Sequence, residues 1–202
     1  YRQANYSDEK WQGFNARVNY SYDNRFYLDL VANYSGSDKF FYTANKKELY
    51  PAVSAAWMLS EEKFMKGTRN WLDFLKIRAS WGITGNDEYT YTDTNGVMER
   101  YPARDRWWIY SGQQYFGTSL TKVPFVKEGR TPNYDIETEK ARMINVGIEA
   151  ELFKHRLGVG LDIWHENRTK IFNVSEGTLP KVLGSFDSRL PIMNDGEVRS
   201  QG

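Results

Sequence analysis

The stretch from Ile144 to Ile163 alternates between apolar and polar side chains with a period of two. Every second residue from Ile144 to Leu152 is apolar, and so is every second residue from Leu157 to Ile163. The residues between them are polar or glycine, and only the run from Lys154 to Arg156 separates the two halves. This period predicts two β-strands joined by a tight turn, each with one apolar and one polar face.

The same alternation recurs along the chain and predicts an all-β, antiparallel fold with about six long strands. The predicted strands lie near residues 14–22, 26–35, 49–59, 74–84, 141–153 and 157–166. The predicted long connections lie near residues 36–48, 85–140 and 167–202. Only the stretch after Ser60 has a helical pattern, with Ser60 as the expected cap of a single turn.

The predicted strands have roughly 9–11 residues, the length that crosses a bilayer at a tilt of about 45°. Strands of about 5–6 residues are usual in soluble sheets. The connections also alternate between short and long, as in outer-membrane barrels. Since backbone groups in lipid must be paired, strands can cross a membrane only as a closed barrel. The pattern therefore favours a segment of a transmembrane β-barrel, with lipid on one face and a wet lumen on the other.

The amino-acid composition excludes several classes of structure and function. The 27 Lys and Arg residues nearly balance the 26 Asp and Glu residues, so no nucleic-acid-binding surface is indicated. The absence of cysteine excludes disulfides and thiolate metal sites. No apolar stretch reaches the roughly 18 residues of a transmembrane helix. A soluble all-β polysaccharide-binding module stays open, because it explains the alternation equally well, but it explains the strand length and the loop asymmetry poorly.

The residues with catalytic potential do not form a recognisable set. His155 and His165 do not form an H-E-x-x-H pair. Glu149 and Glu151 share one predicted face and could act as an acid and a base, but solvation in a lumen is the simpler reading. We therefore expect no catalytic, cofactor-binding or metal-binding residue, and a β-rich hydrolase lacks a credible catalytic set.

Several phrases of the sequence resemble a known family. They are "LYPAVSAAWMLSEEKFMK", "LDFLKIRASWGITGND", "MINVGIEAELFKHRLGVGLDIWHENRTKIF", the opening "FNARVNYSYDNRFYLDLVANYSGSDKF" and the closing "VRSQG". They resemble the C-terminal barrel half of the SusC/RagA family, the TonB-dependent outer-membrane transporters of Bacteroidetes. The resemblance covers most of the chain outside the variable loops at residues 89–135 and 174–193.

The resemblance implies a barrel of 22 strands with an N-terminal plug domain and a TonB-contacting segment. Neither of these two parts is visible in this sequence, so we expect the chain to be an internal segment of a longer protein. The implied function is import across the outer membrane of a Gram-negative bacterium, without enzymatic activity. The implied partners are a SusD-like surface lipoprotein that acts as a lid, TonB, outer-membrane lipid, and an oligosaccharide or peptide cargo.

One stretch is a candidate for ligand contact, "YPARDRWWIYSGQQYF" at residues 101–116. It combines flat aromatic side chains with hydrogen-bonding ones, a mixture that suits sugar rings, peptides or a lid protein. The predicted ligand- or lid-contacting residues are Trp107, Trp108, Tyr110, Tyr115, Arg104 and Arg106. Packing of this loop against neighbouring loops is the alternative.

Overall fold

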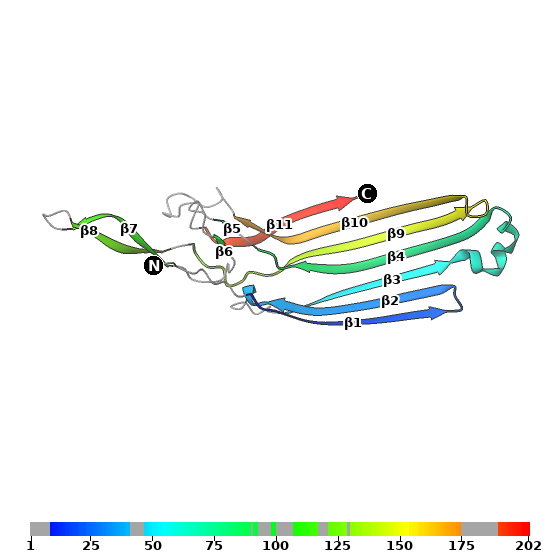
Figure 1. Cartoon of the computed structure of the whole chain (residues 1–202), viewed down its shortest axis with the longest axis horizontal. Helices are drawn as coiled ribbons and strands as arrows, with labels where there is room; N and C mark the ends of the chain where they lie inside the picture. The colour runs from blue at the N-terminus through cyan, green and yellow to red at the C-terminus, as the bar shows by residue number, and fades with distance from the viewer. Residues whose placement is uncertain are drawn as a thin grey trace.

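The computed structural model describes residues 9–40, 47–89, 91–92, 98–99, 107–116, 121–128, 130–174 and 190–202. Seven strands form one antiparallel sheet, in the spatial order β1-β2-β3-β4-β9-β10-β11 (Figure 1). Their bounds are β1 (Trp11–Tyr22), β2 (Phe26–Ser37), β3 (Glu48–Met58), β4 (Leu72–Asn86), β9 (Glu139–Leu152), β10 (Leu157–Val174) and β11 (Ile192–Gln201). The predicted all-β antiparallel fold is confirmed, and each of the six predicted strands lies on one of these strands.

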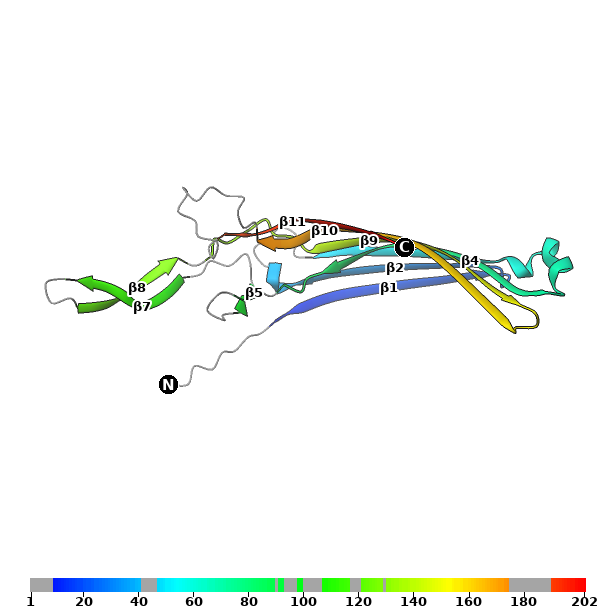
Figure 2. The ribbon, with the colours of Figure 1, turned by 90° about the horizontal axis from the view of Figure 1, so that it is seen from above.

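Two smaller sheets lie within the connection between β4 and β9. They pair β5 (Tyr91–Thr92) with β6 (Met98–Glu99), and β7 (Trp107–Phe116) with β8 (Thr121–Glu128). The β7–β8 hairpin extends beyond the ends of the long strands in both views of the molecule (Figure 1 and Figure 2). The sequence predicts this region as an outer loop, without the hairpin.

The predicted loop over residues 167–202 needs a correction. Strand β10 continues to Val174, and β11 covers Ile192–Gln201. The extension of β10 escapes a period-two search because it carries polar residues on both faces, and its register shifts twice between Thr169 and Asn173. The Asn194 to Gly196 triplet reads as a turn but lies extended within β11.

One end of the sheet, here called the turn end, carries the compact connections β1–β2, β3–β4 and β9–β10; it lies at the right of Figure 1. Between β1 and β2, Asp23 and Asn24 both have φ of 51°, as in the type I′ turns that suit hairpins. Between β3 and β4 lie two 3-10 helices, η2 (Leu59–Glu61) and η3 (Lys63–Thr68). Ser60 is buried inside η2 and does not cap it, because the N-cap position is Met58.

The β9–β10 turn is built from three consecutive residues in the left-handed region, Phe153, Lys154 and His155, with φ of 57°, 59° and 60°. Such angles are strained for residues other than glycine. The turn is held from outside: the Phe153 N–H donates to the Trp71 carbonyl oxygen at 2.9 Å, and the His155 N–H donates to Asp73 Oδ2 at 3.1 Å. The end of the β3–β4 connection and the start of β4 thus stabilise the turn beside them.

The opposite end of the sheet, here called the loop end, carries the connections β2–β3, β4–β9 and β10–β11. We call these the three long connections. A buried apolar cluster lies there, formed by Phe40, Tyr89, Ile136 and Ile192, with Phe172 packed against it. Phe40 belongs to the short 3-10 helix η1 (Asp38–Phe40) that follows β2. A small buried core therefore lies where the chain passes from the long strands into these connections.

Within the described ranges, no helix is both long enough and apolar enough to cross a membrane.

Candidate functional site

The pairing register gathers the apolar residues of six strands on one face of the sheet. One row across the sheet, from β1 to β9, consists of Val18, Leu30, Val53, Trp81 and Ile144, each the Cα partner of the next. Four of these side chains remain exposed, Leu30 by 44% and Ile144 by 50%, and Val53 is half-buried. In the described part of the chain, no second layer packs on this face.

The opposite face carries charged residues that pair with one another. We call six of them the polar wall: Arg17, Asp29, Lys76, Arg78, Glu149 and Asp162. At one side of this wall, Arg17 on β1 binds the Asp29 carboxylate of β2 with two nitrogen atoms, at 3.0 Å for Nε to Oδ1 and 2.6 Å for Nη2 to Oδ2. The Asn19 side-chain amide donates a third hydrogen bond to the same carboxylate, at 2.9 Å.

The second part of the polar wall spans β4, β9 and β10. Lys76 Nζ lies 3.1 Å from Glu149 Oε2, and Arg78 Nε lies 3.1 Å from Glu149 Oε1. Arg78 Nη2 also donates to both oxygens of Asp162, at 2.9 Å each. Arg78 therefore contacts carboxylates on two successive strands.

This bridge passes over Gly147, the Cα partner of both Arg78 and Asp162. A Cβ atom at Gly147 would lie 2.4 Å from Asp162 Oδ1 and 2.8 Å from Arg78 Nε. Both distances are too short for a side chain to fit without moving the ion pair. The glycine on the polar face of β9 thus leaves room for the contact above it.

The polar wall does not form an acid and base pair. Glu149 is engaged by Lys76 and Arg78, whereas Glu151 accepts a hydrogen bond from the ring of His155 in the neighbouring turn. Among the described residues, no three His, Asp or Glu side chains are grouped so that they could hold a metal ion. The arrangement offers hydrogen bonds and compensated charge rather than a reactive group.

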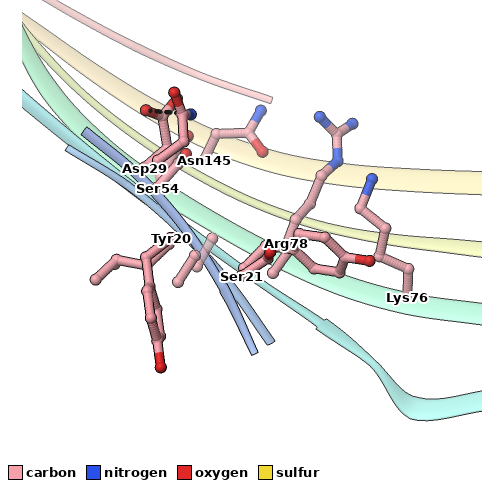
Figure 3. A pocket seen from close by; sticks show the side chains of 14 residues that line it. Tyr20, Ser21, Asp29, Ser54, Lys76, Arg78 and Asn145 are labelled. Atoms are coloured by element: carbon pink, nitrogen blue, oxygen red, sulfur yellow. Dashed lines mark hydrogen bonds between the residues drawn. The ribbon is translucent and has the colours of Figure 1, made fainter. Parts of the chain in front are cut away.

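A groove of about 610 Å³ runs along this face, over β1 to β4 and β9. Figure 3 shows Lys76, Arg78 and Asn145 pointing to one side of the strands and Tyr20 to the other. Its polar lining residues include Asn19, Ser21, Asp29, Ser54, Lys76, Arg78, Ser80 and Asn145. Such a surface can hold water or a hydrogen-bonding solute.

The predicted ligand-contacting residues belong in sequence to the connection between β4 and β9. Arg104 and Arg106 lie outside the described residues. Trp107, Trp108, Tyr110 and Tyr115 all lie on β7, of which the structure describes the backbone, with Trp107 opposite Glu128 and Trp108 opposite Lys127. Their role as contact residues stays a prediction.

Comparison with known proteins gives the chain its relatives. No protein-family model matches it. It is 30% identical over 199 residues to TonB-dependent receptor P26 of Formosa agariphila, covering 98% of this chain and 18% of the relative. It is 27% identical over 164 residues to TonB-dependent receptor SusC of Bacteroides thetaiotaomicron, covering 78% of this chain and 15% of the relative.

Solved structures share the fold. The chain superposes on the RagAB peptide importer in the open-open state with a TM-score of 0.76, at 20% identity, over 96% of this chain and 19% of that chain. For a second structure, the RagAB peptide transporter, the TM-score is 0.75 at 22% identity, over 96% of this chain and 19% of that chain. These similarities support a fragment of a SusC/RagA-type TonB-dependent receptor. The chain spans less than a fifth of the length of the curated relatives it matches.

Proposed function

We propose that this chain forms part of the barrel wall of a TonB-dependent importer in the outer membrane of a Gram-negative bacterium. The observation that carries the proposal is the exposed apolar face across six strands, backed by the ion-paired polar wall. A soluble protein would cover such a face with a second layer, whereas a bilayer covers it with lipid. This argues against the soluble polysaccharide-binding module.

The height of the apolar face fits a membrane. The apolar positions of β9 run from Ile144 to Leu152, which spans about 26 Å at roughly 3.3 Å per residue. At a tilt of about 40° this stretch rises about 20 Å along the membrane normal, close to the apolar band of about 25 Å in known barrels. The polar wall then faces the lumen at the depth of the lipid.

We further propose that the cargo is an oligosaccharide or a peptide, taken up with a SusD-like surface lipoprotein and driven through TonB. The names of the relatives support two parts of this proposal: SusC is a TonB-dependent receptor, and two solved structures are of a RagAB peptide importer or transporter. The groove over the polar wall suits either cargo, since both carry many hydrogen-bonding groups. The protein would move its cargo without making or breaking a covalent bond.

Deletion of the gene for the full protein in its host tests the proposal. Cells should lose uptake of labelled members of one class, oligosaccharides or peptides, and should regain it on complementation. The same loss is expected when TonB is removed. A host with unchanged uptake of both classes, or a protein recovered without the membrane, would refute the proposed function.

A further inference from the structure

The start of β11 is fastened to the segment that precedes β9. The Asn194 side chain accepts a hydrogen bond from the Glu137 N–H at 2.8 Å and donates to the Glu137 carbonyl oxygen at 2.8 Å. Its second amide hydrogen goes to the Lys170 carbonyl oxygen on β10, also at 2.8 Å. One side chain thus joins three stretches of backbone, and we call Asn194 with these contacts the Asn194 clamp.

Further contacts strengthen the same junction. Asn133 donates to the Ile192 carbonyl oxygen at 2.7 Å, and its own side-chain oxygen accepts from the Asp135 N–H at 3.0 Å. Lys170, which has φ of 61° at the irregular part of β10, forms an ion pair with Glu137. The irregularity that places Lys170 in this conformation therefore also presents its carbonyl group and its ammonium group to the clamp.

The buried cluster under the clamp joins all three long connections. Its members are Phe40, Tyr89, Ile136 and Ile192, and Phe172 packs against them. Phe40 lies near the start of the connection from β2 to β3, and Tyr89 and Ile136 lie near the two ends of the one from β4 to β9. Phe172 and Ile192 lie in the strands that flank the connection from β10 to β11. Each long connection thus has at least one of its ends in the same cluster.

The rings of the cluster pack directly on one another. Phe172 stacks on Phe40 with ring centroids 6.3 Å apart and meets Tyr89 edge-on at 5.3 Å. Ile136 is 0% exposed and Ile192 is 1% exposed. No member can leave without opening a cavity beside the others, so the free energies of ordering the connections are coupled.

We propose that the loop-end cluster and the Asn194 clamp make the bases of the three long connections one cooperative unit, which orders and loosens as a whole. Cooperative units of this kind are known from native-state hydrogen exchange. A ligand that stabilised the base of one connection would therefore stabilise the other two as well. The inference does not depend on the nature of the cargo.

Hydrogen exchange on the full-length protein in detergent micelles tests this unit. Asn194→Ala removes all three clamp bonds, which are part-buried, and we expect exchange to rise about five- to a hundredfold through their loss. The rise should include residues 136–139 and 170–174, which contact Asn194, and also 38–40 and 87–89, which do not. A second variant, Ile192→Val, perturbs the cluster without removing any clamp bond. It should accelerate the same residues by about two- to tenfold.

Asn145→Ala is the matched control, since Asn145 lies on the polar face of β9 away from the loop end. It should leave all of these segments at their original rates. The proposal is overturned if Asn194→Ala accelerates only the residues bonded to it while 38–40 and 87–89 keep their rates. If Asn194→Ala does not fold, Ile192→Val decides the matter by the same criterion.

Discussion

Arg78 on β4 binds Asp162 on β10 across the whole width of the strand between them. The Arg78 Nη2 atom lies 2.9 Å from each carboxylate oxygen, and only Gly147 of β9 leaves room for this contact. This ion pair therefore depends on the absence of a side chain at Gly147.

Replacing Gly147 by alanine should break this contact. The added Cβ would push both exposed side chains aside, so the expected cost is that of the lost ion pair, about 0.2–1 kcal/mol. The temperature at which the folded band is lost on gel electrophoresis of the full-length protein measures the effect. Gly160 lies on the polar face of β10, and a Cβ added there would have nothing within 4 Å. Gly160→Ala should therefore change this temperature little. Equal effects of the two variants would contradict the crossing geometry.

The facing of the strands predicts opposite outcomes at two adjacent positions. Val146 lies on the apolar face, opposite Ala79 and Ile163, whereas Asn145 lies on the polar face opposite Ser80. Val146→Arg should destabilise the inserted protein by about 2–4 kcal/mol if it faces the centre of the bilayer, and Asn145→Arg far less. Folding of the full-length variants into lipid vesicles measures the difference. Similar folding of both would show that the faces are assigned wrongly.

The β9–β10 turn should respond to pH through His155. The hydrogen bond to Glu151, together with the nearby charge of Asp73, raises the pKa of His155 above its ordinary value of 6.5. The resulting stabilisation is complete below about pH 6.5 and is lost as the pH rises through the higher folded-state pKa. Amide exchange of residues 153–157, corrected for intrinsic rates, should show this loss. In His155→Gln the step should vanish, and a step that persisted would assign it to another group.

The topology predicts which ends of the strands face the outside of the cell. A cysteine in place of Thr118, which lies outside the described residues between β7 and β8, should react with a membrane-impermeant thiol reagent on whole cells. His155→Cys, at the turn end, should react only after the outer membrane is opened. Labelling of the second variant on intact cells would reverse the proposed orientation.

Trp107 and Trp108 are expected to have different roles. They are consecutive residues of β7, and consecutive residues of a strand face opposite sides. One of the two alanine variants should weaken cargo binding or lid closure, and the other should mainly loosen the hairpin. Titration of cargo against each purified variant, with the lipoprotein present, separates them. Unchanged affinity and closure in both would leave this hairpin a structural role only.

The sheet was predictable because alternation over long strands is a strong local signal. Ile144 to Ile163 encodes a hairpin whose faces need no tertiary information. The outer part of β10 and strand β11 were missed because both are polar on both faces. There the local signal at Asn194 was that of a turn, and tertiary contacts with Glu137 and Lys170 override it.

The polar wall was only partly predictable. Parity along the strands places Lys76, Arg78, Glu149 and Asp162 on one face, but their partners depend on the register between strands. The bridge from Arg78 to Asp162 skips a strand, so no rule for adjacent strands would find it. Once the register is known, such a bridge can be recognised in a sequence by a glycine whose partners on the two adjacent strands carry opposite charges.

The polar wall also determines the electrostatic field that acts on a solute moving along it. Its three cations, Arg17, Lys76 and Arg78, are matched by three anions, Asp29, Glu149 and Asp162, all within ion-pair distance of a partner. Such a surface has strong local dipoles and almost no net field beyond about one Debye length. A charged solute would be neither trapped nor repelled along it, and salt would hardly alter its passage. In the proposed lumen, this surface would thus neither hold nor repel a charged cargo. Selection of the cargo would then depend on other parts of the protein.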